Sequence, residues 1–155
     1  AAAETGKAVN IKKGQFLSPW DMKWVVEKAK AVGNPAIMVC ERGASFGYHH
    51  LVTDFCAFQI MHEETHCPVI FDVTHSLQMP GSGQGLTGGR REFVPTLARA
   101  AVATGFVSGL FIETHPHPEQ ALSDGATSWP MDQMQPLLEQ VIRLDRARKE
   151  EITYA

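Results

Sequence analysis

Four short apolar runs recur along the chain, and each ends next to a polar residue suited to catalysis. The runs are Val9–Lys12, Ala36–Cys40, Val69–Val73 and Gly109–Ile112, and a segment with helical periodicity follows each one. The runs are apolar on both faces, which is typical of parallel strands covered by helices. Strand–helix units repeated in this way form parallel sheets through right-handed crossovers. The sequence therefore predicts an α/β fold.

The polar residues at the ends of these runs are Lys12, Arg42, His75 and Glu113. In (β/α)8 barrels the active site is assembled at the carboxyl ends of the strands. We therefore predict a TIM barrel, of which residues 1–155 form the C-terminal half, about the last four βα units of a single domain. A four-stranded flavodoxin-like sheet is the alternative, but no G-x-G-x-x-G phosphate fingerprint follows the first strand.

The first six residues suggest that the sequence opens inside a domain. Ala1–Gly6 has neither the basic nor the apolar segment of a signal peptide. It is typical of the last turn of a helix, closed by Gly6 as a C-terminal cap. We therefore expect further barrel sequence before Ala1.

Charge and composition exclude several classes of function. The formal net charge of −3 gives no electrostatic basis for binding nucleic acid or an anionic membrane. The apolar runs are far shorter than the roughly 18 residues that a membrane span needs. The three cysteines have no paired spacing, so we expect reduced thiols and a cytoplasmic protein.

Two of the strand ends carry cations suited to an anionic substrate. Lys12 and Lys13 close the first strand, and because side chains alternate along a strand only one of them can face the barrel mouth. The sequence leaves open which one does. Arg42 precedes Gly43 in a glycine-rich loop, Glu41–His50, where a guanidinium group suits phosphate or carboxylate recognition.

The other two strand ends suggest a metal site. His75, Glu113 and the loop residue Asp124 supply one imidazole and two carboxylates, a set that suits a divalent metal ion. Use of His75 as a general acid or base is the competing interpretation. His62–His66 matches the H-E-x-x-H pattern, but it falls at a helix end before the third strand, where a barrel has no active site.

Two long loops and four helices complete the expected fold. The loops are Thr74–Arg90, which is rich in glycine, and Glu113–Pro130. Loops of this length without regular structure are usually lids or binding loops. We expect the helices after Ser18, over Leu51–Glu64, over Arg91–Thr104 and over about Met131–Glu150.

Four motifs resemble the 3-deoxy-D-manno-octulosonate 8-phosphate synthase family. They are Asn10–Pro19, Cys40–Gly43 with Phe46-Gly47-Tyr48, Phe71–Gln78 and Glu113–Pro116, and they occur in the family's order over nearly the whole chain. The resemblance covers only the second half of that enzyme. It implies a homotetrameric transferase that condenses phosphoenolpyruvate with D-arabinose 5-phosphate, releasing inorganic phosphate, in lipopolysaccharide biosynthesis.

The resemblance also assigns residues. It implies that Lys12 and Arg42 hold phosphoenolpyruvate, that Gln15 and Arg90 join them in binding substrate, and that Lys12, His75 and Asp124 are catalytic. His75, Glu113 and Asp124 would be metal ligands in the metal-dependent branch, for Fe, Zn or Mn. The fourth ligand, a cysteine, and the groups that grip the arabinose phosphate would belong to the first half.

Ser123-Asp124 and Arg91-Glu92-Phe93 resemble the metal-dependent branch, although Gly125 departs from its pattern. The nearest rival is 3-deoxy-D-arabino-heptulosonate 7-phosphate synthase, a related barrel with metal ligands on similar strands. Phe46-Gly47-Tyr48 and Ser76-Leu77-Gln78 argue against it. A third alternative is that the half barrel alone is inactive, because unpaired strand edges favour association.

Overall fold

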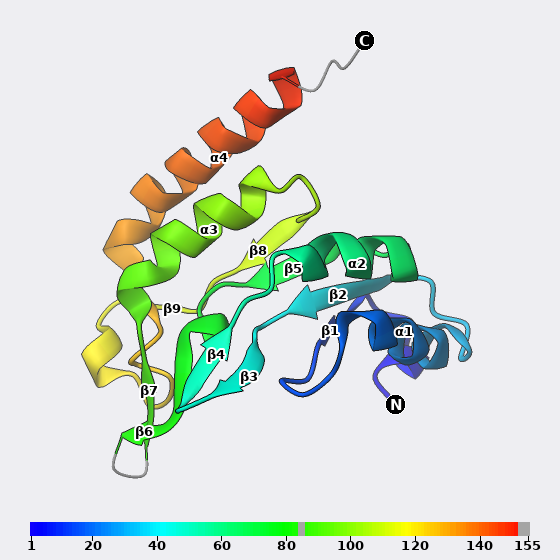
Figure 1. Cartoon of the computed structure of the whole chain (residues 1–155), viewed down its shortest axis with the longest axis horizontal. Coiled ribbons are helices and arrows are strands. Elements are labelled where there is room, and N and C mark those ends of the chain that lie inside the picture. The colour runs from blue at the N-terminus through cyan, green and yellow to red at the C-terminus, as the bar shows by residue number, and fades with distance from the viewer. Residues whose placement is uncertain (84–85, 152–155) are drawn as a thin grey trace.

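The centre of the fold is a four-stranded parallel sheet. The computed structural model describes residues 1–83 and 86–151. The strands lie side by side in chain order: β1 (Val9–Lys12), β2 (Ile37–Glu41), β5 (Val69–Asp72) and β8 (Gly109–Phe111). Figure 1 shows the sheet with β1 at one side and β8 at the other. All four predicted strands are confirmed, with small differences at their ends.

A helix follows each strand, as predicted. The helices are α1 (Met22–Lys30), α2 (Cys56–Thr65), α3 (Val94–Ala103) and α4 (Met134–Glu151). Single 3-10 turns lead into α1, α3 and α4 at Pro19–Asp21, Arg91–Phe93 and Met131–Gln133. Pro95 lies in the first turn of α3, where it removes no helical hydrogen bond. In the part of the chain that the structure describes, no helix has the length and apolarity needed to cross a membrane.

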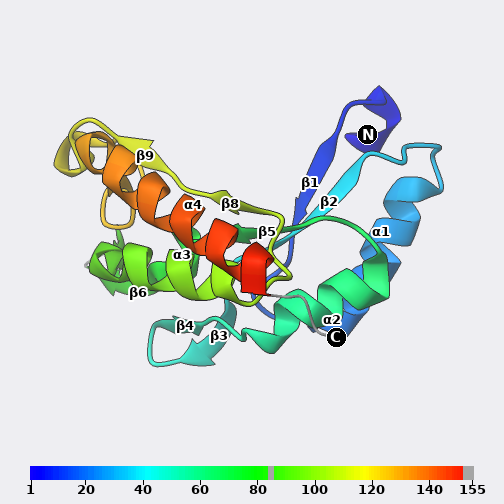
Figure 2. The ribbon, with the colours of Figure 1, turned by 90° about the horizontal axis from the view of Figure 1, so that it is seen from above.

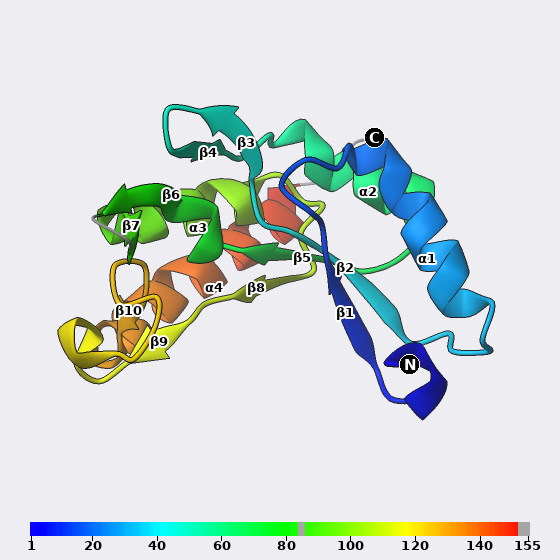
Figure 3. The same cartoon turned by 90° about the horizontal axis from the view of Figure 1, so that it is seen from below.

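The strand order distinguishes this sheet from a doubly wound one. Neighbouring strands are consecutive βα units, so the order never reverses as it does in a flavodoxin-like sheet. Viewed from below, β5 and β8 lie in front of α3 and α4 (Figure 3). The described residues form an open sheet and not a closed barrel, because neither β1 nor β8 has a second strand partner among them. The α/β class with a parallel sheet is thus confirmed, and the closed (β/α)8 barrel is not seen in this chain.

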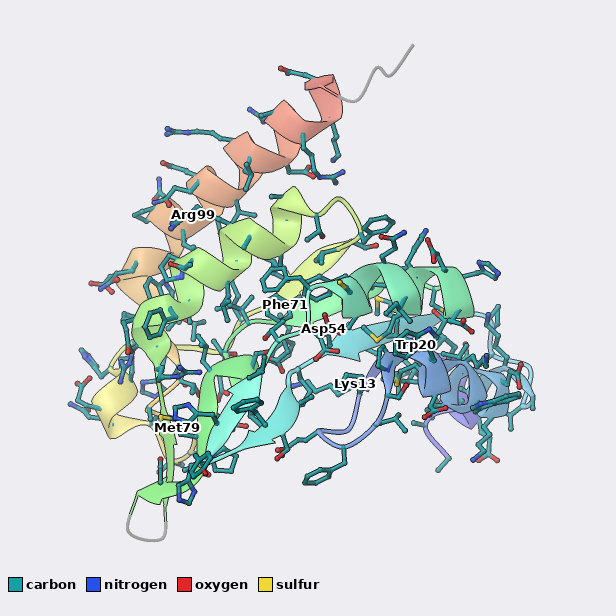
Figure 4. The ribbon with its side chains drawn as sticks, viewed as in Figure 1. Lys13, Trp20, Asp54, Phe71, Met79 and Arg99 are labelled. Atoms are coloured by element: carbon teal, nitrogen blue, oxygen red, sulfur yellow. The ribbon has the colours of Figure 1, made fainter. Side chains whose placement is uncertain are left out.

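The two faces of the sheet differ in what covers them. Val39, Val69 and Phe71 are fully buried in one core cluster with side chains of all four helices. The ring of Phe71, labelled in Figure 4, lies 5.1 Å from that of Phe58 on α2. Because side chains alternate along a strand, the intervening residues face the other way. Ile70 and Phe111 accordingly lie outside the core cluster, on what we call the open face.

Three segments predicted as loops contain paired strands. The segment after β2 forms the hairpin of β3 (Ala44–Gly47) and β4 (His50–Val52), so α2 begins at Cys56 and not at Leu51. The segment after β5 contains the short 3-10 turn His75–Leu77 and the pairing of β6 (Gln78–Gly83) with β7 (Leu86–Gly89). The two hairpins lie side by side (Figures 1 and 2). The last loop holds the parallel pair β9 (Thr114–His115) and β10 (Trp129–Pro130).

The remaining predictions concern the first turn and the H-E-x-x-H segment. Ala3–Thr5 forms a 3-10 turn that Gly6 closes with a left-handed backbone, φ 70°, as the cap pattern predicted. His62 lies in the last turn of α2, and His66 follows that helix as its cap. The only group of three or more potential ligands among the described residues is elsewhere, at His75, Glu113 and Asp124.

Candidate active site

Of the two lysines at the end of β1, Lys12 faces the open side of the sheet. Lys12 lies on the open face, where its Nζ is 2.5 Å from Oδ2 of Asp72 and 4.1 Å from the ring centre of Phe111. Lys13 points to the helix side, where only 2% of its side chain is exposed, against 39% for Lys12. Lys12 is therefore the lysine that a ligand on the open face can reach.

Lys13 has a structural partner instead. Its Nζ lies 3.6 Å from Oε2 of Glu41, and it donates hydrogen bonds to the carbonyls of Gly14 and Leu17. The backbone N–H of Gly43 donates to Oε1 of Glu41 at 2.6 Å. Burial raises the pKa of Glu41, although Lys13 acts in the opposite direction. The pair thus ties the end of β1 to the loop that carries Arg42.

His75, Glu113 and Asp124 come together although they are far apart in the sequence. One potential ligand atom from each lies within 4.8 Å of the others. His75 follows β5, Glu113 follows β8, and Asp124 comes from the loop between β9 and β10. Nε2 of His75 is 3.0 Å from Oε2 of Glu113. One imidazole and two carboxylates at this separation fit a divalent transition-metal ion.

Asp72 is a buried residue of this site to which the sequence analysis assigned no role. Its carboxylate accepts a hydrogen bond from Nδ1 of His75, 2.8 Å from Oδ2, as well as the contact from Lys12. Burial acts to raise the pKa of Asp72, but the hydrogen bonds from His75 and Lys12 outweigh it and the pKa is lowered. The signal in the sequence was a carboxylate inside an otherwise apolar strand, Val69–Val73.

Arg42 reaches the same site through Gln78. Nη2 of Arg42 donates to the side-chain oxygen of Gln78 at 2.5 Å, and the amide nitrogen of Gln78 donates to Oδ1 of Asp124 at 2.7 Å. Nη1 of Arg42 is buried and has no hydrogen-bond partner among the described residues. Such an unpaired guanidinium nitrogen suits an anionic ligand. Gln78 belongs to a motif that the resemblance used, but no role was predicted for it.

Two predicted substrate-binding residues lie apart from this cluster. The backbone carbonyl of Gln15 accepts a hydrogen bond from Ser45, and Gln15 lines a pocket with the β3–β4 hairpin. The guanidinium carbon of Arg90 lies 5.7 Å from the ring centre of Phe93, and Arg90 lines a pocket with Leu77. Within the described residues, no hydrogen bond or ion pair joins either side chain to the three potential metal ligands. Their roles stay predictions.

A model of the DAHP synthetase I family matches residues 1–150. The chain belongs to this family. It is 62% identical over 144 residues to a 2-dehydro-3-deoxyphosphooctonate aldolase of Xanthomonas campestris pv. campestris (strain B100), and 66% identical over 145 residues to one of Stenotrophomonas maltophilia (strain K279a). Each match covers 93% of this chain and 51% of the relative.

The chain thus spans about half the length of the curated relatives that it matches. The family resemblance predicted from the sequence motifs is confirmed, because the matched relatives carry the name of the octulosonate enzyme. What those relatives do as whole proteins is a separate question for this chain.

Proposed function

We propose that this chain provides half of an enzyme that condenses phosphoenolpyruvate with D-arabinose 5-phosphate and water. The products would be 3-deoxy-D-manno-octulosonate 8-phosphate and inorganic phosphate. The observation that carries this proposal is the convergence of Lys12 and Arg42 with three potential metal ligands on one side of the sheet. Relatives at 62–66% identity, named 2-dehydro-3-deoxyphosphooctonate aldolase, support it.

In this proposal the fold is a (β/α)8 barrel, and residues 1–155 are the C-terminal half of that single domain. The consecutive strand order and the charged pair Lys12–Asp72 on the open face support a barrel interior. The outer edges of β1 and β8 would pair with strands of the first half. A barrel needs this closure because an unpaired edge leaves backbone groups without partners.

The residues divide between binding the anion and holding a metal. Lys12 and Arg42 would bind the negative charges of phosphoenolpyruvate and stabilise the phosphate as it leaves. Gln15 and Arg90 would complete the substrate contacts, and the β6–β7 hairpin would close over them to exclude water. His75, Glu113 and Asp124 would hold Fe, Zn or Mn together with a cysteine outside this chain. A bound cation would supply Lewis acidity and orient the aldehyde or water.

The same resemblance supports a homotetramer in the cytoplasm that serves lipopolysaccharide biosynthesis. Size-exclusion chromatography with light scattering would measure the assembly directly. A stable monomer would contradict the tetramer.

Product analysis tests the reaction. The protein, expressed at the length that its natural gene encodes, is supplied with phosphoenolpyruvate and either D-arabinose 5-phosphate or D-erythrose 4-phosphate. We expect turnover with the arabinose phosphate. A clear preference for erythrose phosphate would favour the heptulosonate enzyme, the second candidate, which the name of the matching family supports. The third possibility, an inactive half barrel, predicts no turnover by the isolated 155-residue chain.

A further inference from the structure

Asp72 lies where the anion-binding and metal-binding parts of the site meet. It is the last residue of β5, its side chain is fully buried, and it points to the open face. Its Oδ2 is 2.5 Å from Nζ of Lys12 and 2.8 Å from Nδ1 of His75. One oxygen therefore contacts both the lysine and the histidine.

The other carboxylate oxygen of Asp72, Oδ1, bonds to residues that closely follow Asp72 in the sequence. Oδ1 accepts hydrogen bonds from the backbone N–H of His75 at 3.0 Å and from the hydroxyl of Thr74 at 3.2 Å. The oxygen of Thr74 in turn accepts the backbone N–H of Glu113 at 3.1 Å. The carboxylate is thus fixed by residues 74 and 75, and it connects to the strand end that carries Glu113.

Phe111 lies next to both Lys12 and His75. Its ring centre lies 4.1 Å from Nζ of Lys12 and 5.8 Å from the ring centre of His75. The aromatic face attracts the ammonium group and limits where it can move. Lys12 is therefore held between a buried carboxylate and a ring, with 39% of its side chain open to solvent.

We propose that Asp72 is a positioning residue shared by Lys12 and His75, so that a single carboxylate orients both the phosphoenolpyruvate-binding ammonium and the metal-binding imidazole. This inference rests on the proposed function and extends it to a residue that touches neither substrate nor metal. A carboxylate on the far nitrogen of a metal-binding histidine fixes the ring and raises its basicity. The same carboxylate holds Lys12 at the edge of the cluster, so its loss disturbs two binding events at once.

The pair Lys23–Glu64 provides a control outside the site. Nζ of Lys23 on α1 lies 2.9 Å from Oε2 of Glu64 on α2. A general effect of removing a lysine-bound carboxylate would appear in both Asp72→Asn and Glu64→Gln. An effect that belongs to the site would appear only in Asp72→Asn.

Isothermal titration calorimetry measures the two affinities separately, on the protein at the length its gene encodes. Zn²⁺ is titrated into metal-free protein, and phosphoenolpyruvate is titrated into a second metal-free sample. We expect Asp72→Asn to weaken Zn²⁺ binding by about 10–100-fold, the usual effect of losing an outer partner of a metal ligand. We expect it to weaken phosphoenolpyruvate binding too, and Glu64→Gln to leave both affinities at the wild-type value.

Thermal denaturation reports whether each variant folds. If Asp72→Asn does not fold, Asp72→Glu gives the result, because it keeps the charge and only displaces it; we expect a smaller loss of both affinities. Loss of one affinity with the other unchanged would overturn the shared role. So would unchanged affinities in a folded variant of Asp72. A wild-type protein that binds neither Zn²⁺ nor phosphoenolpyruvate would overturn the proposed function itself.

Discussion

The side-chain amide of Gln78 donates a hydrogen bond to Asp124 at 2.7 Å, across 46 positions of sequence. On its other side the same amide accepts a hydrogen bond from Arg42. Asp124 has a left-handed backbone, φ 52°, which an aspartate adopts at some energetic cost. Asp124 is a potential metal ligand, and the orientation of its side chain depends strongly on the amide of Gln78.

We therefore expect Gln78→Ala to weaken metal binding by about tenfold, the low end for an outer partner of a metal ligand. It should also raise KM for phosphoenolpyruvate, because Arg42 loses its only side-chain partner among the described residues. Calorimetry and steady-state kinetics measure the two effects. Gln59→Ala is the control, since the side chain of Gln59 donates to Glu63 on the exposed side of α2 and has no other side-chain hydrogen bond among the described residues. Equal behaviour of the two variants would contradict this role for Gln78.

His75→Ala tests the proposed metal site directly. It removes the one nitrogen-bearing side chain among the three potential ligands, so the loss of affinity should exceed the about 10–100-fold expected for an outer partner. Elemental analysis of the purified variant should find no bound transition metal, and activity should be lost. Chelation of the wild-type protein should likewise stop turnover. Full turnover in the presence of chelator would refute the metal-dependent assignment.

The pH dependence of stability should reveal the raised pKa of Glu41. Burial raises the pKa of Glu41 in the folded chain above its usual value near 4.5. Between these two pKa values the folded state binds more protons than the unfolded state, so stability falls as pH rises. Glu41→Gln lacks this titration. The free energy of unfolding of the wild type, relative to this variant, should therefore decrease as the pH rises above 4.5. Urea denaturation at a series of pH values measures it, and parallel curves would contradict the assignment.

The three cysteines should differ in reactivity. Burial raises the pKa of Cys40 to about 12, so almost none of it is thiolate at neutral pH. Cys67 is also buried, whereas Cys56 is exposed at the start of α2. We expect iodoacetamide to modify Cys56 first in the folded protein, as peptide mass spectrometry would show. Early modification of Cys40 would contradict the burial of its side chain in β2.

The sequence predicted the regular framework well because its signals are local. The apolar runs that became β1, β2, β5 and β8 are short, bounded and each followed by a helical pattern. That His75 and Glu113 lie close together followed from one geometric rule, that parallel strands end at a common edge. Asp124 lies in a loop, and its place in the ligand set rested on its residue type and on the family resemblance.

The hairpin of β3 and β4 was missed because its turn lacks the usual residues. Tyr48 and His49 join the two strands, and both have positive φ values, 51° and 62°. A two-residue turn of this kind normally carries Asn-Gly or Asp-Gly, which is the strongest hairpin signal in a sequence. Because Tyr48 and His49 occupy these two positions, the sequence carries no such hairpin signal. The glycines of the following segment similarly suggested a loop where β6 and β7 pair.

The roles of Asp72 and Gln78 depend on tertiary contacts that sequence spacing does not encode. Asp72 meets Lys12 from another strand, and Gln78 meets Arg42 and Asp124 from two other segments. The choice between Lys12 and Lys13 is of the same kind. It required knowing which face of β1 the helices cover.

The adjacent lysines of β1 also limit how this protein can change over evolutionary time. Because Lys12 and Lys13 project from opposite sides of the same strand, deleting Asn10 while Val9 keeps its place would reverse the side that each lysine faces. The ammonium group of Lys13, now paired with Glu41, would be moved toward Asp72, and the apolar side chain of Ile11 would turn away from the core. Related sequences should therefore vary in the side chains of this strand much more readily than in its length.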